Sequence, residues 1–197
     1  MKHNFCYILI SLFLISCESK APIEVKQIVS NEMVTLEDNY KDRSSIKDSI
    51  RISIPLEFEI TINSSLAYIA WHYNVNGEIL NESRFDYQVY DKQNKTKQIR
   101  QLDFKETLNS NPISIILKER NHLISKKEAQ ELLKKYNVNR SLDNLNSNDT
   151  IKLTTYDKFR IENKEMIDDF NKINDSIKFR VMKSDGSFFY LDKKINW

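Results

Sequence analysis

The most constraining feature of this chain is the run from Ile50 to Ile62, in which every even-numbered position is apolar. The odd-numbered positions between them are polar, charged or proline. Successive side chains of a β-strand point to opposite faces, so this alternation predicts one long strand with a buried face and a solvated face. Pro55 has no backbone N–H to donate, and we therefore expect a bulge or an unpaired edge at that position.

Shorter strand-like segments lie on both sides of this run. Asn76-Gly77 and Asp185-Gly186 each separate two of them, and both pairs are typical of the two-residue turn of a β-hairpin. The first turn predicts a return strand over residues 78–89, with a bulge near Glu82 because the apolar positions otherwise fall on different faces. The remaining strands are expected at residues 23–29, 32–36, 66–75, 97–104, 112–117, 150–155, 176–183 and 188–197.

Two segments carry a helical pattern instead. Ser125 and Glu128 form a capping box, and apolar residues then recur at the spacing of one helix face as far as Tyr136. A second helix is expected over residues 163–174. Many short strands with two short helices predict a mainly β chain, folded as one antiparallel β-sandwich domain over residues 23–197 and immunoglobulin-like or transthyretin-like in plan.

The N-terminal segment has the parts of a secretory signal. Lys2 gives a positive start, and the apolar stretch that follows is too short to span a bilayer. Its end, Leu14-Ile15-Ser16-Cys17, resembles the lipobox of bacterial lipoproteins. The resemblance implies that residues 1–16 are a cleaved signal peptide and that Cys17 becomes the lipidated first residue of the mature chain. Residues 17–22 would then form a short lipidated tether.

The resemblance also implies a location. An anchor of several acyl chains holds a protein stably at a membrane surface, which would place this domain in the cell envelope. An aspartate after the cysteine retains some lipoproteins in the inner membrane, whereas the residue here is Glu18, which favours the outer membrane. The alternative is an ordinary secretory signal in which the cysteine has no role.

Composition argues against several classes of function. The 30 basic and 28 acidic residues nearly balance, which disfavours binding to nucleic acid. The chain has only 2 glycines, too few for the glycine-rich loops that hold phosphates or for a nucleophile elbow. With Cys6 in the signal peptide and Cys17 lipidated, no cysteine remains for a disulfide or a metal site. We therefore expect no metal and no cofactor apart from the covalent lipid on Cys17.

Three groups of residues could carry chemistry, and each has a simpler interpretation. Glu57 and Glu59 share one strand face, about 6.5–7 Å apart by strand rise, within the range of paired catalytic carboxylates; we favour a solvated strand face. His72 and His122 lack partners at catalytic or metal-binding spacing, so we expect surface or edge-strand positions. Residues 143–149 are rich in oxygen ligands but lack the glycine and final glutamate of a helix-loop-helix calcium site, which favours a polar loop.

Aromatic residues are the remaining candidates for binding. Trp71, Tyr73, Phe188 and Tyr190 could contribute to a recognition patch, because aromatic side chains dominate the energetics of many protein interfaces. The alternative is that they belong to the core and to cross-strand pairs. Phe188, Phe189 and Tyr190 are consecutive in a predicted strand and cannot all face inward, so one of them must be exposed or covered by a helix.

These observations favour a non-enzymatic, membrane-anchored lipoprotein that binds another envelope protein. It would act as an assembly or accessory component of an envelope machine, or as an immunity lipoprotein that neutralises a toxin. The alternative from another class is an envelope glycan hydrolase that uses Glu57, Glu59 or the pair Asp168/Asp169 as acids.

Overall fold

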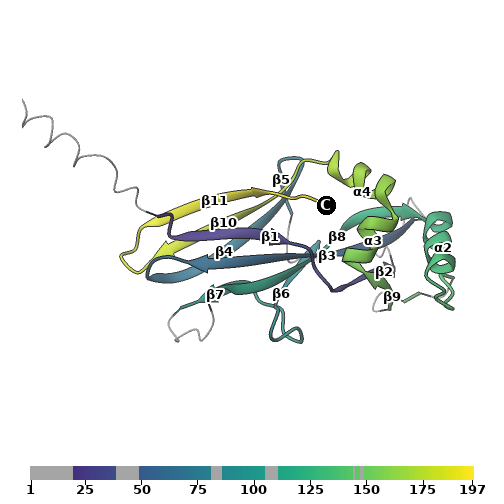
Figure 1. Cartoon of the computed structure of the whole chain (residues 1–197), viewed down its shortest axis with the longest axis horizontal. Helices are drawn as coiled ribbons and strands as arrows, with labels where there is room; N and C mark the ends of the chain where they lie inside the picture. Colours follow the sequence, from purple (N-terminus) through teal and green to yellow (C-terminus); the bar gives the residue numbers. More distant parts are fainter. Residues whose placement is uncertain (1–19, 39–48, 81–85, 105–110, 144, 147–148) are drawn as a thin grey trace, which may run out of the picture.

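The predicted antiparallel arrangement of strands is confirmed. The computed structural model describes residues 20–38, 49–80, 86–104, 111–143, 145–146 and 149–197. In this part of the chain two antiparallel sheets enclose one hydrophobic core, as expected of a mainly β sandwich. The helices gather at one end of the sandwich, opposite the end at which the chain runs into its first strand (Figure 1).

The first sheet, called sheet A here, is built around the long alternating strand. Its order is β6 (Tyr87–Asp91), β8 (Ile113–Ser125), β3 (Ser49–Ile62), β2 (Met33–Asp38) and β9 (Thr150–Thr155), with β1 (Ile23–Ile28) also paired with β3. The second sheet, sheet B, has the order β11 (Phe188–Lys194), β10 (Asp175–Lys183), β4 (Leu66–Val75) and β5 (Glu78–Ile79), with β7 (Gln101–Asp103) paired with β4.

Strand β3 has the predicted buried face, but its other face is not solvated. Leu56 and Phe58 lie fully inside the core, as the alternation predicts. On the opposite face, however, Arg51, Ser53 and Glu57 are also buried. The prediction of a solvated face is therefore wrong for most of the strand, because β3 is central in its sheet and other parts of the chain cover its outer side.

Pro55 lies at an interruption in the neighbouring strand. β1 pairs with β3 from Glu57 onward, and β2 pairs with β3 only as far as Ser53. Pro55 falls in the gap between these two ladders, where a residue without an N–H costs no hydrogen bond on that side. The predicted unpaired position is thus confirmed locally, although β3 is not an edge strand.

The hairpin at Asn76-Gly77 forms as predicted, but its return strand is short. Both turn residues have positive φ, 50° and 86°, and the Leu80 amide donates to the Tyr73 carbonyl at 2.8 Å. β5 then ends at Ile79, and the next strand, β6, belongs to sheet A. The single strand predicted over residues 78–89 is therefore wrong. The apolar residues change face because the chain changes sheet, and Glu82, where a bulge was expected, lies outside the described residues.

Three helices are described where two were predicted. α2 (Lys126–Lys135) has the predicted capping box, with Ser125 and Glu128 each bonded to the other's backbone. α4 (Lys164–Asn171) corresponds to the second predicted helix. α3 (Tyr156–Glu162) was not predicted; it continues directly from β9 and packs two aromatic side chains into the core. Strand β8 is also much longer than the segment predicted at residues 112–117.

Hydrogen bonds tie the start of the described chain to the turns at one end of the sandwich. The Asn63 side chain donates to the Ala21 carbonyl at 3.1 Å, and the Ser184 amide donates to the Ser65 carbonyl at 3.2 Å. The β3–β4 turn therefore lies beside both the N-terminal segment and the β10–β11 turn. Cys17 precedes the described residues, and none of the described helices has the length and apolar character needed to cross a bilayer.

Candidate functional site

The outer face of sheet B carries an aromatic cluster that the strand register brings together. Met182 of β10 pairs with Phe188 of β11 and with Tyr68 of β4. Arg180, two residues before Met182, pairs with Tyr190. Residues at i and i+2 of a strand share a face, so these side chains lie side by side on the outside of the sandwich. We call the set Tyr68, Arg180, Phe188 and Tyr190 the aromatic patch.

Two rings of the aromatic patch are open to solvent. Phe188 is 50% exposed and Tyr190 is 56% exposed. Their ring centroids lie 6.4 Å apart with 21° between the planes, and Tyr68 meets Phe188 edge to face at 6.5 Å. The position of the strand is set by the turn before it, where Gly186 has a φ of 85° and the Asp185 carboxylate accepts from the Ser187 amide and hydroxyl. The prediction that Phe188, Phe189 and Tyr190 cannot all face inward is confirmed, because Phe188 and Tyr190 are exposed and Phe189 is partly buried on the opposite face.

The guanidinium group of Arg180 lies within the aromatic patch and has no acidic partner among the described residues. Its guanidinium carbon lies 5.5 Å from the Tyr68 ring centroid and 5.9 Å from that of Phe188, within cation–π range. In the described part of the chain no carboxylate forms an ion pair with Arg180, and its Nε is buried without a hydrogen-bond acceptor. The charge is thus free to meet an acidic group of a ligand.

A hollow of about 460 Å³ adjoins the aromatic patch. Arg180 lines it together with His72, Ile79 and Arg100. His72 is exposed, as predicted, and Ile79 is among the exposed large apolar side chains. The combined surface therefore offers flat aromatic rings, an exposed aliphatic side chain and two arginines. Such a surface suits a partner that presents apolar side chains beside an acidic group.

Trp71 and Tyr73 expose little of their side chains at this surface. Both point inward from β4 and are buried, which agrees with the alternative that they belong to the core, although Trp71 also lines the hollow. The Tyr73 hydroxyl donates to the Asp175 carboxylate at 3.4 Å, and burial raises the pKa of Tyr73 well above its ordinary value. The period of the strand explains the difference, because residues of odd number in β4 face the core while Tyr68 and His72 face out.

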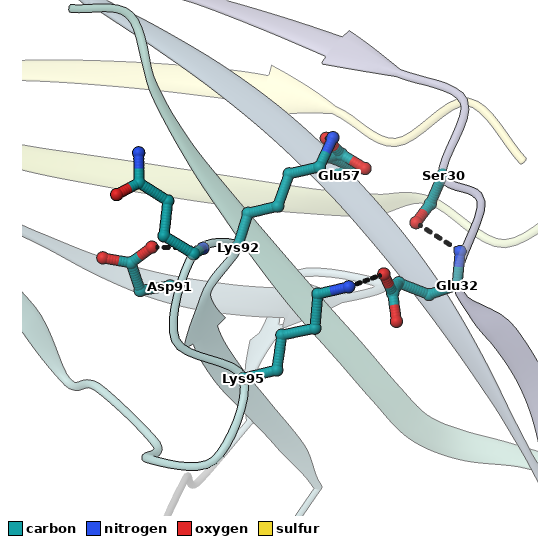
Figure 2. A network of polar contacts seen from close by, with 7 residues as sticks. Ser30, Glu32, Glu57, Asp91, Lys92 and Lys95 are labelled. Atoms are coloured by element: carbon teal, nitrogen blue, oxygen red, sulfur yellow. Dashed lines mark hydrogen bonds and ion pairs between the residues drawn. The ribbon is translucent and has the colours of Figure 1, made fainter. Parts of the chain in front are cut away.

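Glu57 lies on the outer face of sheet A, covered by a lysine. It is 2% exposed and forms an ion pair with Lys92, which reaches over it from the segment after β6 (Figure 2). Lys95 of the same segment pairs with Glu32. Glu59, two residues along β3, is only half-buried. The two predicted carboxylates thus lie in unlike surroundings, and Glu57 has a structural ion pair in place of the predicted solvated setting.

His122 is buried between the two sheets, which contradicts the surface position predicted for it. Its ring stacks on Phe170 at 4.2 Å and meets Trp197 edge to face at 4.9 Å. Its Nε2 lies 3.6 Å from a Glu119 oxygen and 3.9 Å from an Asp175 oxygen. Burial lowers the pKa of His122 to about 4, so the ring is neutral at physiological pH.

Burial changes the pKa of Asp175 in the opposite direction to that of His122. It raises the pKa of this carboxyl to about 6, although bonds from Tyr73 and Trp197 act to lower it. The charged forms of both groups are thus disfavoured by the same low-dielectric surroundings. Among the described residues, no three His, Cys, Asp or Glu side chains gather as ligands for a metal ion.

The other acidic candidates are exposed. Asp143 pairs with Lys126 at 2.6 Å, and three residues of the loop 143–149 lie outside the described part. Asp168 and Asp169 lie on the solvent side of α4. Comparisons of the whole chain with protein-family models, with curated proteins and with solved structures find no match.

Sequence analysis did not identify Tyr68 or Arg180 as site residues. Their place beside Phe188 follows from the pairing of β4, β10 and β11, which joins segments more than 100 residues apart. The only local signal was the Asp185-Gly186 turn, which fixes the β10–β11 register and so places Arg180 opposite Tyr190.

Proposed function

We propose that this chain is a lipid-anchored protein of the bacterial cell envelope that binds another protein through the aromatic patch. One observation carries the binding proposal: two exposed rings, Phe188 and Tyr190, flank an arginine that has no acidic partner among the described residues. Tyrosine, tryptophan and arginine are the residues most often found at the energetic centre of protein interfaces. An aromatic cluster of this kind left open on a monomer indicates an interaction surface.

The anchor proposal rests on the lipobox at Cys17 and gains a geometric consequence from the fold. Three residues separate Cys17 from Ala21, so their Cα atoms are at most about 14 Å apart in an extended chain. Ala21 lies at the end of the sandwich that holds the β3–β4 and β10–β11 turns. With a lipid on Cys17, that end faces the membrane and the helices face away from it. Glu18 favours the outer membrane as the site of anchoring.

The aromatic patch supports protein binding better than glycan hydrolysis. The hydrolase hypothesis required two carboxylates in a cleft, with one pKa raised for acid catalysis. Glu57 instead lies under Lys92 on the face of a sheet. The partner could be a component of an envelope machine or a toxin, and its identity decides between the accessory and the immunity versions of the proposal.

Photo-crosslinking in living cells tests the binding proposal. A benzoylphenylalanine at position 190 should trap one defined partner, whereas the same group in place of the exposed Lys152 on β9 should not. Adding the substitution Arg180→Gln to the position-190 crosslinker should reduce the yield of the adduct several-fold, because it removes the cation of the aromatic patch. A resident envelope protein in the adduct supports the accessory role, and a toxin supports immunity. No adduct at position 190, or the same adducts at both positions, would reject the patch.

Metabolic labelling with palmitate tests the anchor separately. The wild-type chain should incorporate the label and fractionate with membranes, and Cys17→Ala should lose both properties. Cys6→Ala is the matched control, because it removes the other cysteine and lies in the segment expected to be cleaved. Label retained in Cys17→Ala would show that the lipobox interpretation is wrong while leaving the aromatic patch untouched.

A further inference from the structure

A second surface, at the helical end of the molecule, has a different chemistry from the aromatic patch. Helix α2 lies on one side and α3 with α4 on the other (Figure 1). Residues of these helices line a groove of about 720 Å³. Its floor includes Leu132 and Phe170, which belong to the core. We call this surface the helical groove.

The helical groove contains large apolar side chains that the described part of the chain leaves exposed to solvent. Ile161 of α3 is 60% exposed and Leu123 at the end of β8 is 44% exposed. Met166 of α4 adds a half-buried thioether chain. Methionine and aliphatic side chains along a groove between helices are the usual contact surface for the apolar face of another helix.

The walls of the helical groove are acidic. Five carboxylates line it against two lysines: Glu128, Glu131, Glu162, Glu165 and Asp169 against Lys135 and Lys164. Bonds from Ser125 lower the pKa of Glu128, while the negative charge of Asp169 across the groove acts to raise it. Carboxylates of the two walls are therefore close enough to repel each other, and a cation between them would relieve this repulsion.

Lysines of the chain itself offset part of this charge, but only through exposed pairs three or four residues apart. Glu131 pairs with Lys127 at 4.0 Å, Glu162 with Lys158 at 3.8 Å and Asp169 with Lys172 at 2.5 Å, and all six residues are exposed. Exposed pairs of this kind contribute little and are easily replaced by another cation. Lys135 instead donates to the Glu162 carbonyl and the Asn163 side chain at 2.7 and 2.8 Å.

We propose that the helical groove binds a basic amphipathic helix of a partner protein. Apolar residues of that helix at the i, i+3, i+4 and i+7 positions would contact Ile161, Leu123 and Met166, and flanking lysines or arginines would meet the acidic walls. The carboxylates of the lining favour this occupant over nucleic acid, anionic lipid and acidic peptides, which would bring further negative charge beside them. The inference is independent of the aromatic patch and of the lipid anchor.

Fluorescence anisotropy with designed peptides tests this proposal. The protein is the chain 17–197 with Cys17→Ala, which carries no lipid and needs no detergent. The probe is a labelled peptide of about 18 residues, about 27 Å long as a helix, with leucines on one face and lysines on the other. We expect a dissociation constant on the order of 10 µM at low salt. A peptide of the same composition without the apolar face should bind at least about tenfold more weakly.

Two variants of the helical groove and one control variant on sheet B separate binding in the groove from general attraction between charges. Glu131→Gln with Glu165→Gln should weaken binding about tenfold, whereas Glu78→Gln with Asp192→Asn, which removes the same charge from sheet B, should change it less than about twofold. Ile161→Asp should also weaken binding about tenfold, although it adds negative charge, because it removes the exposed apolar contact. All these positions are exposed, and thermal unfolding would verify that each variant folds.

Several results would overturn the proposal. Equal binding of the peptide without an apolar face, or tighter binding to Ile161→Asp, would show that the surface attracts any polycation. Binding of the matched peptide with glutamates in place of lysines would contradict the charge argument. Concentration-dependent self-association of the chain that Ile161→Asp abolishes would make a second copy the occupant. The photo-crosslinking at position 190 is unaffected by any of these outcomes, so the two surfaces are tested separately.

Discussion

The surroundings of Glu57 on sheet A and of Arg180 on sheet B handle charge in opposite ways, although sheet B also has an exposed ion pair between Lys178 and Asp192. On sheet A, cations of the chain lie over its own carboxylates: Lys92 over Glu57, Lys95 over Glu32 and Arg120 beside Glu37. On sheet B, Arg180 lies among aromatic rings and has no such partner among the described residues. Glu57 and Arg180 both lie on strands with neighbours on both sides, β3 and β10, so their positions in the sheets are comparable.

On this difference we base the proposal that the surroundings of Glu57 are structural and that the aromatic patch binds a partner. A carboxylate buried under its own lysine has its electrostatic interaction satisfied within the chain, and little remains for a ligand. The Arg180 guanidinium has only cation–π contacts within the described part of the chain, and two of the aromatic side chains around it are half exposed. It can still form a charge-assisted hydrogen bond with a carboxylate of a partner, which is stronger than a cation–π contact. Three predictions test whether this comparison is correct.

The largest effect on stability is expected from removing the ammonium group of Lys92, which lies over Glu57. Lys92→Met leaves a buried carboxylate without its partner and should lower the free energy of unfolding by about 3 kcal/mol. Arg180→Met removes a cation of sheet B and should cost about 1 kcal/mol or less, because only cation–π contacts are lost. Urea denaturation at neutral pH measures both values. Equal costs would show that the two faces do not differ as proposed.

The next largest effect is expected from two buried titratable groups, His122 and Asp175, which should make the free energy of unfolding depend on pH. His122 has a folded-state pKa of about 4, below its ordinary value, so unfolded chains bind its proton more readily and stability rises as pH increases from about 4 to 6.5. Asp175 has a folded-state pKa of about 6, above its ordinary value, so its contribution to stability is lost as pH rises through about 6. The two contributions oppose each other in the wild type.

Removing either group should reveal the other. We expect the stability of His122→Gln to fall, relative to the wild type, by about 2 kcal/mol between pH 4 and pH 7. Asp175→Asn should show the opposite trend, with stability rising relative to the wild type over the same range. Chemical denaturation at a series of pH values tests both variants. Curves parallel to the wild type would mean that neither group changes its pKa on folding.

The smallest effect on stability is expected at the aromatic patch itself. Phe188→Ser or Tyr190→Ser should change the free energy of unfolding by about 0.5 kcal/mol or less, since both side chains are largely exposed in the free protein. Phe189→Ser is the matched control, because it lies between them and packs against the core, and it should cost about 1–2 kcal/mol. Thermal unfolding measures all three. A large cost at Tyr190 would indicate that the patch is structural.

Local features of the fold could be predicted well from the sequence. The alternation placed β3, the turn at Asp185-Gly186 placed the β10–β11 hairpin, and the capping box placed the start of α2. Each depends on residues within a few positions of one another, where backbone geometry fixes which side chains meet. Two of the four predicted aromatic residues, Phe188 and Tyr190, lie at the surface. Their exposure also depends on local geometry, since alternate residues of a strand share a face.

Features that depend on distant segments could not be predicted in this way. Glu57 was assigned to solvent because its strand alternates, yet Lys92 covers it from a segment 35 residues away. His122 was assigned to the surface, yet Phe170 and Trp197 enclose it. Helix α3, which was not predicted, has Thr155 at its N-cap without a side-chain hydrogen bond to the helix, and it continues directly from strand β9, so the sequence showed no capping box where it begins.

By itself, the sequence determined that this chain is a mainly β protein with a lipobox-like N-terminal segment and a long central strand, because these properties are written in the order of neighbouring residues. The tertiary structure alone decided that the chain changes sheet between β5 and β6, that Glu57 has an ion-pair partner and that Arg180 has none among the described residues. These outcomes depend on which distant segments cover each face, and that is set by packing of the whole core rather than by any local pattern.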